Sequence, residues 1–237
     1  MDPRVNVFNR DALNHGGYLY TSSARLSCRL ATTRSTEAIL ETRMFPGRSV
    51  LDIACGDGYY TIQFFDRGKP SRMVGVDLAF HAVRVAHANK QTRSMQFVVG
   101  DAHRLPWPDN TFDMVLVQSI LHHDDHPAGL IQEAFRVAPL VLIHEPNGNN
   151  LGLKIIERLS RYHREHHERS YTPSQLDLWI REAGGSVLRR RFAGFVPMFC
   201  PDSVARLMKA VEPILERIPL LRALACAVVV ITAVRSG

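Results

Sequence analysis

Three aspartates stand where short apolar runs give way to small residues. Asp52 lies near the end of the first run, Asp77 ends the second, and Asp101 follows the third across a single glycine. Apolar runs without polar alternation are typical of strands covered on both faces of a parallel sheet. In open α/β sheets, ligands bind outside the carboxyl ends of such strands. The three acids are therefore predicted to surround one ligand, since packing alone does not explain them.

The turn after the first run indicates which ligand this is. Gly56 and Gly58 let backbone N–H groups approach a ligand closely. A dinucleotide site has a third glycine where this chain has Thr61, and the carboxylate of Asp52 would repel a pyrophosphate. The same carboxylate suits a ligand with a cationic amine and a sulfonium, and S-adenosylmethionine (SAM) has both. The turn therefore favours SAM over a nicotinamide cofactor.

This stretch resembles motif I of the class I SAM-dependent methyltransferases, where an acid and an apolar residue precede G-x-G-x-G. Ala54 replaces the first glycine of that motif. The resemblance extends over residues 48–145 and, with the sequence after residue 118, points to the small-molecule enzymes related to those of ubiquinone and menaquinone biosynthesis. It implies an α/β fold with a Rossmann-like, seven-stranded, mostly parallel sheet, helices on both faces and an antiparallel last strand.

The resemblance also assigns the cofactor contacts. It places Asp77 on the ribose hydroxyls, and the separation of about 20 residues from the glycine-rich turn suits a βαβ unit. The alternative for Asp77 is a cap on the helix expected near Ala79. Asp101 is expected at the adenine amino group and Gln118 near the methionine part. The full set of expected cofactor residues is Asp52, Ala54, Cys55, Gly56, Gly58, Asp77, Leu78, Asp101, Ala102 and Gln118.

Histidines and one glutamate follow the fourth and fifth predicted strands, where the family has its acceptor site. Methyl transfer is an in-line displacement that depends chiefly on alignment, and it needs a base only if the acceptor loses a proton. Histidine has a suitable pKa for that base. The predicted catalytic residues are His122, His123, His144 and Glu145, of which His122 and Glu145 are also predicted to bind substrate. The alternatives are helix capping, packing or an exposed loop.

The organisation of the chain favours one domain, residues 1–237. Residues 1–47 are expected to form a helical lid, with one helix over residues 22–42. Tyr18 and Tyr20 of this lid either line the acceptor pocket or pack the helix on the sheet. Residues 48–145 form the expected SAM-binding core, with its fifth strand over residues 137–145. Residues 146–237 supply an amphipathic helix at 151–164, a helix that starts with a capping box at Thr172 and Gln175, an insertion at 195–222 over the acceptor and a last strand at 223–234.

Composition limits the compartment and the partners. The chain has 237 residues, 46% of them hydrophobic, and a formal net charge of +6 without a dense basic block. Its cysteines show no C-x-x-C spacing, which predicts free thiols in a reducing, cytoplasmic setting: Cys28, Cys55, Cys200 and Cys226. The N-terminus lacks a secretory pattern, and the apolar residues 223–234 fall short of a membrane span.

These features predict SAM-dependent methyl transfer to an O, N or C atom of a small organic acceptor, in the biosynthesis of a specialised metabolite. The alternatives are a nucleic-acid methyltransferase, a SAM-fold subunit without catalysis, and an NAD dehydrogenase. No nucleic-acid partner is expected, and the oligomeric state is open. No metal is expected either, because His163, His166 and His167 match no zinc-site spacing.

Overall fold

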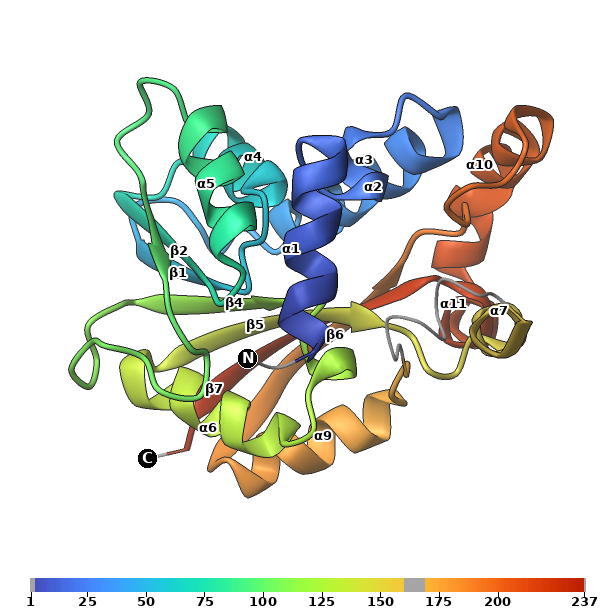
Figure 1. Cartoon of the computed structure of the whole chain (residues 1–237). Coiled ribbons are helices and arrows are strands. Elements are labelled where there is room, and N and C mark those ends of the chain that lie inside the picture. The colour runs from blue at the N-terminus through green and yellow to red at the C-terminus, as the bar shows by residue number, and fades with distance from the viewer. Residues whose placement is uncertain (1–2, 160–168, 237) are drawn as a thin grey trace.

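The protein is built around one seven-stranded sheet (Figure 1). The computed structural model describes residues 3–159 and 169–236. The strand order is β3-β2-β1-β4-β5-β7-β6, and every pairing is parallel except the two made by β7. The strands are β1 (Ser49–Ile53), β2 (Arg72–Asp77), β3 (Gln96–Val99), β4 (Met114–Gln118), β5 (Leu140–Pro146), β6 (Gly185–Ala193) and β7 (Val228–Arg235). The predicted sheet, with its antiparallel last strand, is confirmed.

Helices cover both faces of the sheet, as Figure 1 shows, with α6 and α9 opposite α3 and α4. The described helices are α1 (Pro3–His15), α2 (Leu19–Ser22), α3 (Leu26–Leu40), α4 (Tyr59–Gly68), α5 (Phe80–Asn89), the short 3-10 helix η1 (Leu121–His123), α6 (Pro127–Val137), α7 (Leu151–Leu159), α9 (Pro173–Glu182), α10 (Asp202–Arg217) and α11 (Pro219–Ala225). Within the described residues, no helix has the length and apolar character needed to cross a bilayer.

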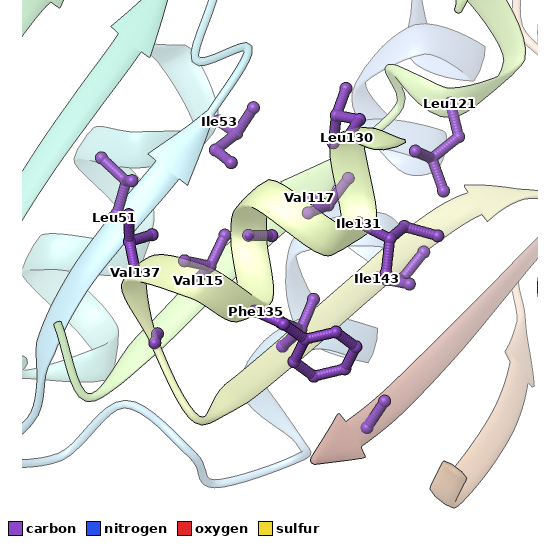
Figure 2. Packing of buried hydrophobic residues seen from close by; sticks show 14 of the residues in the cluster. Leu51, Ile53, Val115, Val117, Leu121, Leu130, Ile131, Phe135, Val137 and Ile143 are labelled. Carbon is purple, nitrogen blue, oxygen red and sulfur yellow. The ribbon is translucent and has the colours of Figure 1, made fainter. Parts of the chain in front are cut away.

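The core under α6 fixes the strand ends that matter for the site. Leu130, Ile131 and Phe135 of α6 are fully buried against β1, β4 and β5 (Figure 2). Leu51 pairs in register with Val115, so the carboxyl ends of β1 and β4 come out side by side. Burial of each such apolar side chain contributes about 1.5–3 kcal/mol. The packing therefore holds the two strands rigidly where the order of the sheet reverses.

Four predicted element boundaries are wrong or incomplete. The helix expected over residues 22–42 is two helices, because residues 23–25 are extended between α2 and α3. The fifth strand begins at Leu140 rather than Val137, which ends α6. The last strand begins at Val228, since residues 223–225 complete α11. The helix expected over residues 151–164 is described only as far as Leu159.

Candidate cofactor and acceptor site

A cavity of about 950 Å³ lies at the carboxyl ends of the central strands. Every predicted site residue except Gly58 and Glu145 lines it, from the lid residue Tyr18 to His144 at the end of β5. Glu145 bonds to His122, which lines the cavity. Ligand sites in proteins typically have volumes of about 300–1,000 Å³. The cavity is thus large enough for a nucleoside cofactor and a second small molecule.

The glycine-rich turn between β1 and α4 follows a left-handed path. Ala54, Gly56 and Gly58 have φ angles of 59°, 54° and 76°. A Cβ on Gly56 would lie 2.5 Å from the ring of Tyr18, and one on Gly58 would lie 2.8 Å from Ala86. The two glycines are therefore required sterically. Ala54 adopts the conformation that suits the glycine of the motif, at a cost of about 1–2 kcal/mol for an L-residue.

Asp52 is a buried carboxylate with one oxygen left for a ligand. The hydroxyl of Thr61 donates to Asp52 Oδ2 at 2.6 Å. Oδ1 has no hydrogen-bond partner among the described residues. Burial raises the pKa of Asp52 to about 7, against the bond from Thr61, which lowers it. In the sequence, Thr61 argues against a dinucleotide site. In the structure, its hydroxyl holds Asp52, the acid that the sequence predicts to bind SAM.

Asp77 bonds to the start of α5, as the capping alternative predicts, and its predicted contact with the ribose stays a prediction. Its Oδ2 accepts a hydrogen bond from the backbone N–H of Gly56 at 2.8 Å, and its Oδ1 accepts one from Ala79, also at 2.8 Å. Burial raises the pKa of Asp77, while these two bonds lower it. Each carboxylate oxygen can accept a second bond. Asp77 therefore fastens the glycine-rich turn to the start of α5 and keeps lone pairs for a ligand.

The outer end of the cavity carries the remaining cofactor candidates. Asp101 is exposed, and its Oδ1 accepts a hydrogen bond from the backbone N–H of His103 at 2.9 Å. Ala102 and the exposed Leu78 border the same end. Cys55 differs, since its thiol packs in an apolar cluster with Val83. Burial raises the pKa of that thiol.

Asp57 is a functional residue that the sequence reasoning missed. Its Oδ2 accepts hydrogen bonds from the backbone N–H of Tyr18 at 2.8 Å and from the hydroxyl of Thr21 at 2.5 Å. Its Oδ1 accepts one from the N–H of Tyr59 at 3.1 Å. Asp57 therefore ties the N-terminal segment to the cofactor turn. The available signal was an acid between two glycines at a helix start, where acids interact favourably with the helix.

The lid tyrosines lie against this turn. The ring of Tyr18 is buried beside Gly56, and its centroid lies 5.9 Å from that of Tyr20 and 5.8 Å from that of Phe8 in α1. Burial raises the pKa of Tyr18. Both tyrosines line the cavity. The two tyrosines therefore border the cavity, and Tyr18 packs on the glycine-rich turn; contact with an acceptor stays a prediction.

A buried histidine–glutamate pair joins η1 to the end of β5. Nδ1 of His122 lies 2.7 Å from Glu145 Oε2. Glu145 Oε1 accepts hydrogen bonds from the backbone N–H groups of Ile120 and Leu121, both at 2.9 Å. Three donors therefore hold a carboxylate that is 1% exposed. A carboxylate facing Nδ1 keeps the proton on that nitrogen and directs the lone pair of Nε2 away from it.

Two further histidines complete this side of the cavity. The ring of His123 lies 4.0 Å from that of His122 and 5.2 Å from Phe8, centroid to centroid. Burial lowers the pKa of His144 to about 4, which keeps its ring neutral near pH 7. Its Nδ1 lies 3.5 Å from the hydroxyl of Ser119, which has a φ of 53°. Such strain in a residue other than glycine is common at functional sites.

A family model described as a methyltransferase domain matches residues 51–139, from β1 to the end of α6. The match covers the turn, the three acids and η1. This segment is a class I SAM-dependent methyltransferase domain. Phosphoethanolamine N-methyltransferase 3 of Arabidopsis thaliana is 36% identical over 105 residues, 42% of this chain and 20% of that protein. The ubiquinone/menaquinone biosynthesis C-methyltransferase UbiE of Ruegeria sp. is 30% identical over 96 residues, 39% of this chain and 38% of that protein.

This chain therefore matches only a fifth to two fifths of these relatives' own lengths. Solved structures extend the likeness of the fold to nearly the whole chain. A methyltransferase complexed with the Trm112 methyltransferase activator of Haloferax volcanii has a TM-score of 0.70 at 18% identity, covering 97% of this chain and 98% of that one. Magnesium protoporphyrin IX methyltransferase of Synechocystis with bound SAH has a TM-score of 0.67 at 15% identity, covering 98% and 97%.

The cavity suits SAM through three polar atoms that lack a partner in the described part of the chain. Asp52 Oδ1, Gln118 Nε2 and His144 Nε2 are buried and have no hydrogen-bond partner among the described residues. All three residues line the cavity. Buried polar groups are normally paired, so these atoms suit a polar ligand. When bound, SAM supplies a methyl group activated by a sulfonium leaving group.

The described part of the chain shows neither a metal-binding cluster nor a disulfide bond. No group of three or more His, Cys, Asp or Glu residues there is placed to hold a metal ion. His163, His166 and His167 lie outside the described residues. The four cysteines are free thiols, with Cys28, Cys55 and Cys226 buried.

Proposed function

We propose that the chain transfers the methyl group of SAM to an O, N or C atom of a small organic acceptor. The observation that carries this proposal is the continuity of one cavity from Asp52, Asp77 and Asp101 to His122. Cofactor groups and a potential base thus open on the same space. In this assignment Asp52 binds the cationic amine, Asp77 the ribose hydroxyls and Asp101 the adenine amino group.

His122 is the proposed base, and Glu145 is its positioning partner. The acceptor's proton passes to Nε2 of His122 while the acceptor lone pair forms the new bond to the methyl carbon and the bond from that carbon to the sulfonium sulfur breaks. Glu145 fixes the ring by the 2.7 Å bond to Nδ1 and stabilises the positive charge that the ring gains. His144 and His123 contribute walls of the cavity. Because the pKa of His144 is about 4, it offers a neutral ring near pH 7 and is a weaker candidate for the base.

The acceptor proposed here has a substantial apolar part. Apolar side chains that line the acceptor end include Leu153, Ile156, Met198, Phe199 and Met208. The relatives named above carry phosphoethanolamine and quinone acceptors in their names, which supports a small molecule from a biosynthetic route. We place residues 1–47 as its lid, 48–145 as the SAM-binding core and 146–237 as the acceptor-side inserts of a single domain.

Calorimetric titration with SAM, S-adenosylhomocysteine and NAD tests the cofactor assignment. Binding of the first two without NAD is expected. A panel of phenols, amines and carbon acids, assayed with methyl-labelled SAM, then tests transfer. His122→Gln should lower kcat by about 10²–10⁴-fold, the usual contribution of a general base, with little change in SAM affinity. His103→Gln, on the cavity rim, is the matched control. SAM binding without transfer to any acceptor class would instead support a non-catalytic subunit.

A further inference from the structure

Helix α10 is oriented with its acids toward the protein. Glu212 is buried and accepts a hydrogen bond from the backbone N–H of Phe195 at 2.9 Å. Glu216 accepts one from the N–H of Gly194 at 2.9 Å and pairs with Arg34. The two acids thus satisfy the loop that follows β6. Because they face inward, the opposite face of α10 is left to solvent.

That outward face is apolar. Its exposed side chains recur at intervals of three and four residues: Val204, Leu207, Val211, Ile214 and Ile218. Leu207 is 68% exposed and Ile214 is 58% exposed. A stripe with this spacing normally faces the core of a protein. Single exposed apolar residues need no explanation, whereas a contiguous group indicates an interaction surface.

The apolar surface continues over two neighbouring helices. Figure 1 shows α7, α10 and α11 gathered at the edge of the molecule opposite β2 and α5, and α11 contacts both other helices. The exposed residues that these helices add are Leu220, Leu221 and Leu224 from α11 and Leu151, Ile155 and Ile156 from α7. Together with the stripe of α10 they form what we term the apolar patch. Met208 and Leu224 of the same helices also line the cavity, so the patch adjoins its acceptor end.

Positive charge lies on two of the helices that carry the apolar patch. Arg206, Arg217 and Arg222 are exposed, and none forms an ion pair with a described residue. In α10 and α11, both fully described, Asp202 is the exposed acid, at the far end of the stripe. A second copy docked on this patch by two-fold symmetry would bring two sets of arginines together, at an electrostatic cost. Anionic headgroups above an apolar layer match both the charge and the apolar area.

We propose that the apolar patch docks on the surface of an anionic lipid bilayer. The apolar side chains of α10 and α11 enter the boundary between headgroups and acyl chains, and the three arginines contact phosphate groups. Helices that lie in this interface bury an apolar face by about 5–10 Å and gain from anionic lipid. The acceptor end of the cavity then opens beside the membrane. This assignment deepens the proposed function by naming where the acceptor is collected.

Sedimentation of the full-length protein with vesicles tests the proposal without SAM or acceptor. Binding is expected to phosphatidylglycerol–phosphatidylcholine vesicles, and it should weaken in pure phosphatidylcholine and in high salt. Leu207→Ser combined with Ile214→Ser should reduce vesicle affinity by about tenfold or more, since each side chain loses much of its transfer free energy. Leu178→Ser combined with Leu188→Ser, on α9 and β6, removes two exposed leucines elsewhere and should leave binding unchanged.

The arginines are tested by charge removal. Replacing Arg206, Arg217 and Arg222 with glutamine should weaken binding to anionic vesicles on the order of 100-fold, at about fivefold for each charge. Arg67, Arg181 and Arg189 replaced together form the control, with the same change in net charge on other surfaces. Equal losses in the two triple variants would overturn docking through the patch, as would absence of vesicle binding by the unmodified protein.

The unmodified protein could instead be a dimer that does not bind vesicles and that dissociates when Leu207→Ser and Ile214→Ser are combined. That result would assign the patch to a second copy and overturn the lipid assignment. Calorimetric SAM binding by the same variants separates this proposal from the proposed function. Intact SAM binding with lost vesicle binding is the expected pattern. If the unmodified protein binds vesicles but not SAM, the docking stands and the methyl-transfer proposal fails.

Discussion

Replacing Asp52 with asparagine should stabilise the ligand-free protein and weaken its binding of SAM. The amide has the shape of the carboxylate, and its oxygen can still accept the 2.6 Å bond from Thr61. What changes is the charge on a buried side chain that is 2% exposed. The two expected effects have opposite signs, so a general folding defect cannot produce both.

The magnitude follows from the pKa of Asp52, which burial raises from 3.8 to about 7. Because the folded state binds the proton more tightly than the unfolded state, Asp52 favours folding most below about pH 4, and this contribution is lost as the pH rises to about 7. A difference of about three in pKa corresponds to about 4 kcal/mol. The Asp52→Asn variant avoids that cost. Its advantage should therefore be absent at pH 4 and fully present at pH 8.

The contribution of Asp52 to SAM affinity should change with pH in the opposite direction to its contribution to stability. The charged form of Asp52 binds the cationic amine, so affinity should fall as the pH drops below about 7, up to tenfold for each pH unit. Asp52→Asn should lose about 10–100-fold in affinity at pH 8, as expected for a hydrogen bond to a charged group. The variant should also lose the pH dependence between pH 5 and 7.

Thermal unfolding from pH 4 to 8 and calorimetry from pH 5 to 8 measure the two quantities. Asp113→Asn is the control, because the bonds from Ser49 lower the pKa of this exposed carboxyl, outside the cavity. It should lose stability at neutral pH and keep the pH profile of SAM binding. A destabilised Asp52→Asn variant at pH 8, or unchanged SAM affinity at that pH, would refute the assignment of Asp52 as the charged partner of the cofactor.

Three other changes probe the turn, the base and the lid. Ala54→Gly should raise the free energy of unfolding by up to about 1 kcal/mol, because relief of the left-handed strain outweighs the added chain entropy; a loss in urea titration would contradict this. Glu145→Gln should lower kcat by at least tenfold, because a neutral amide does not stabilise the positive charge that His122 gains, while SAM affinity measured by calorimetry changes little; equal losses in kcat and SAM affinity would contradict this. Asp57→Ala removes the acceptor for Tyr18 and should cost about 1–3 kcal/mol and increase amide exchange at that residue; unchanged exchange would show that the lid is held elsewhere.

The strand-end acids could be predicted because their signal is local. An acid at the end of an apolar run is visible in a few neighbouring residues, and Asp52 and Asp77 lie where that pattern places them. Contacts between distant segments could not be predicted this way. Asp57 bonds to Tyr18 39 residues earlier, and Glu145 pairs with His122 23 residues before it. Only the folded sheet brings these side chains together.

Helix boundaries failed where two signals overlap. The apolar residues 223–226 suit either a buried strand or the end of a helix, and short apolar runs are ambiguous in this respect. Pro219 begins a new helix after α10, and that helix continues to Ala225 before the chain turns into β7. By contrast, the predicted capping box at Thr172 and Gln175 depends only on residues three apart, and it forms as expected.

The orientation of α10 shows why periodicity alone leaves function undetermined. An apolar stripe predicts a helix with a face to bury, but it does not say against what. Here the loop after β6 presents the N–H groups of Gly194 and Phe195, which need acceptors once the insertion covers them. Glu212 and Glu216 supply those acceptors, so the polar side turns inward and the apolar side turns outward. The hydrogen-bonding needs of one loop thus place an apolar surface beside the acceptor end of the cavity. Ordinary core helices have the same apolar periodicity, so the proposed contact with lipid depends on the orientation of α10 and not on its sequence pattern alone.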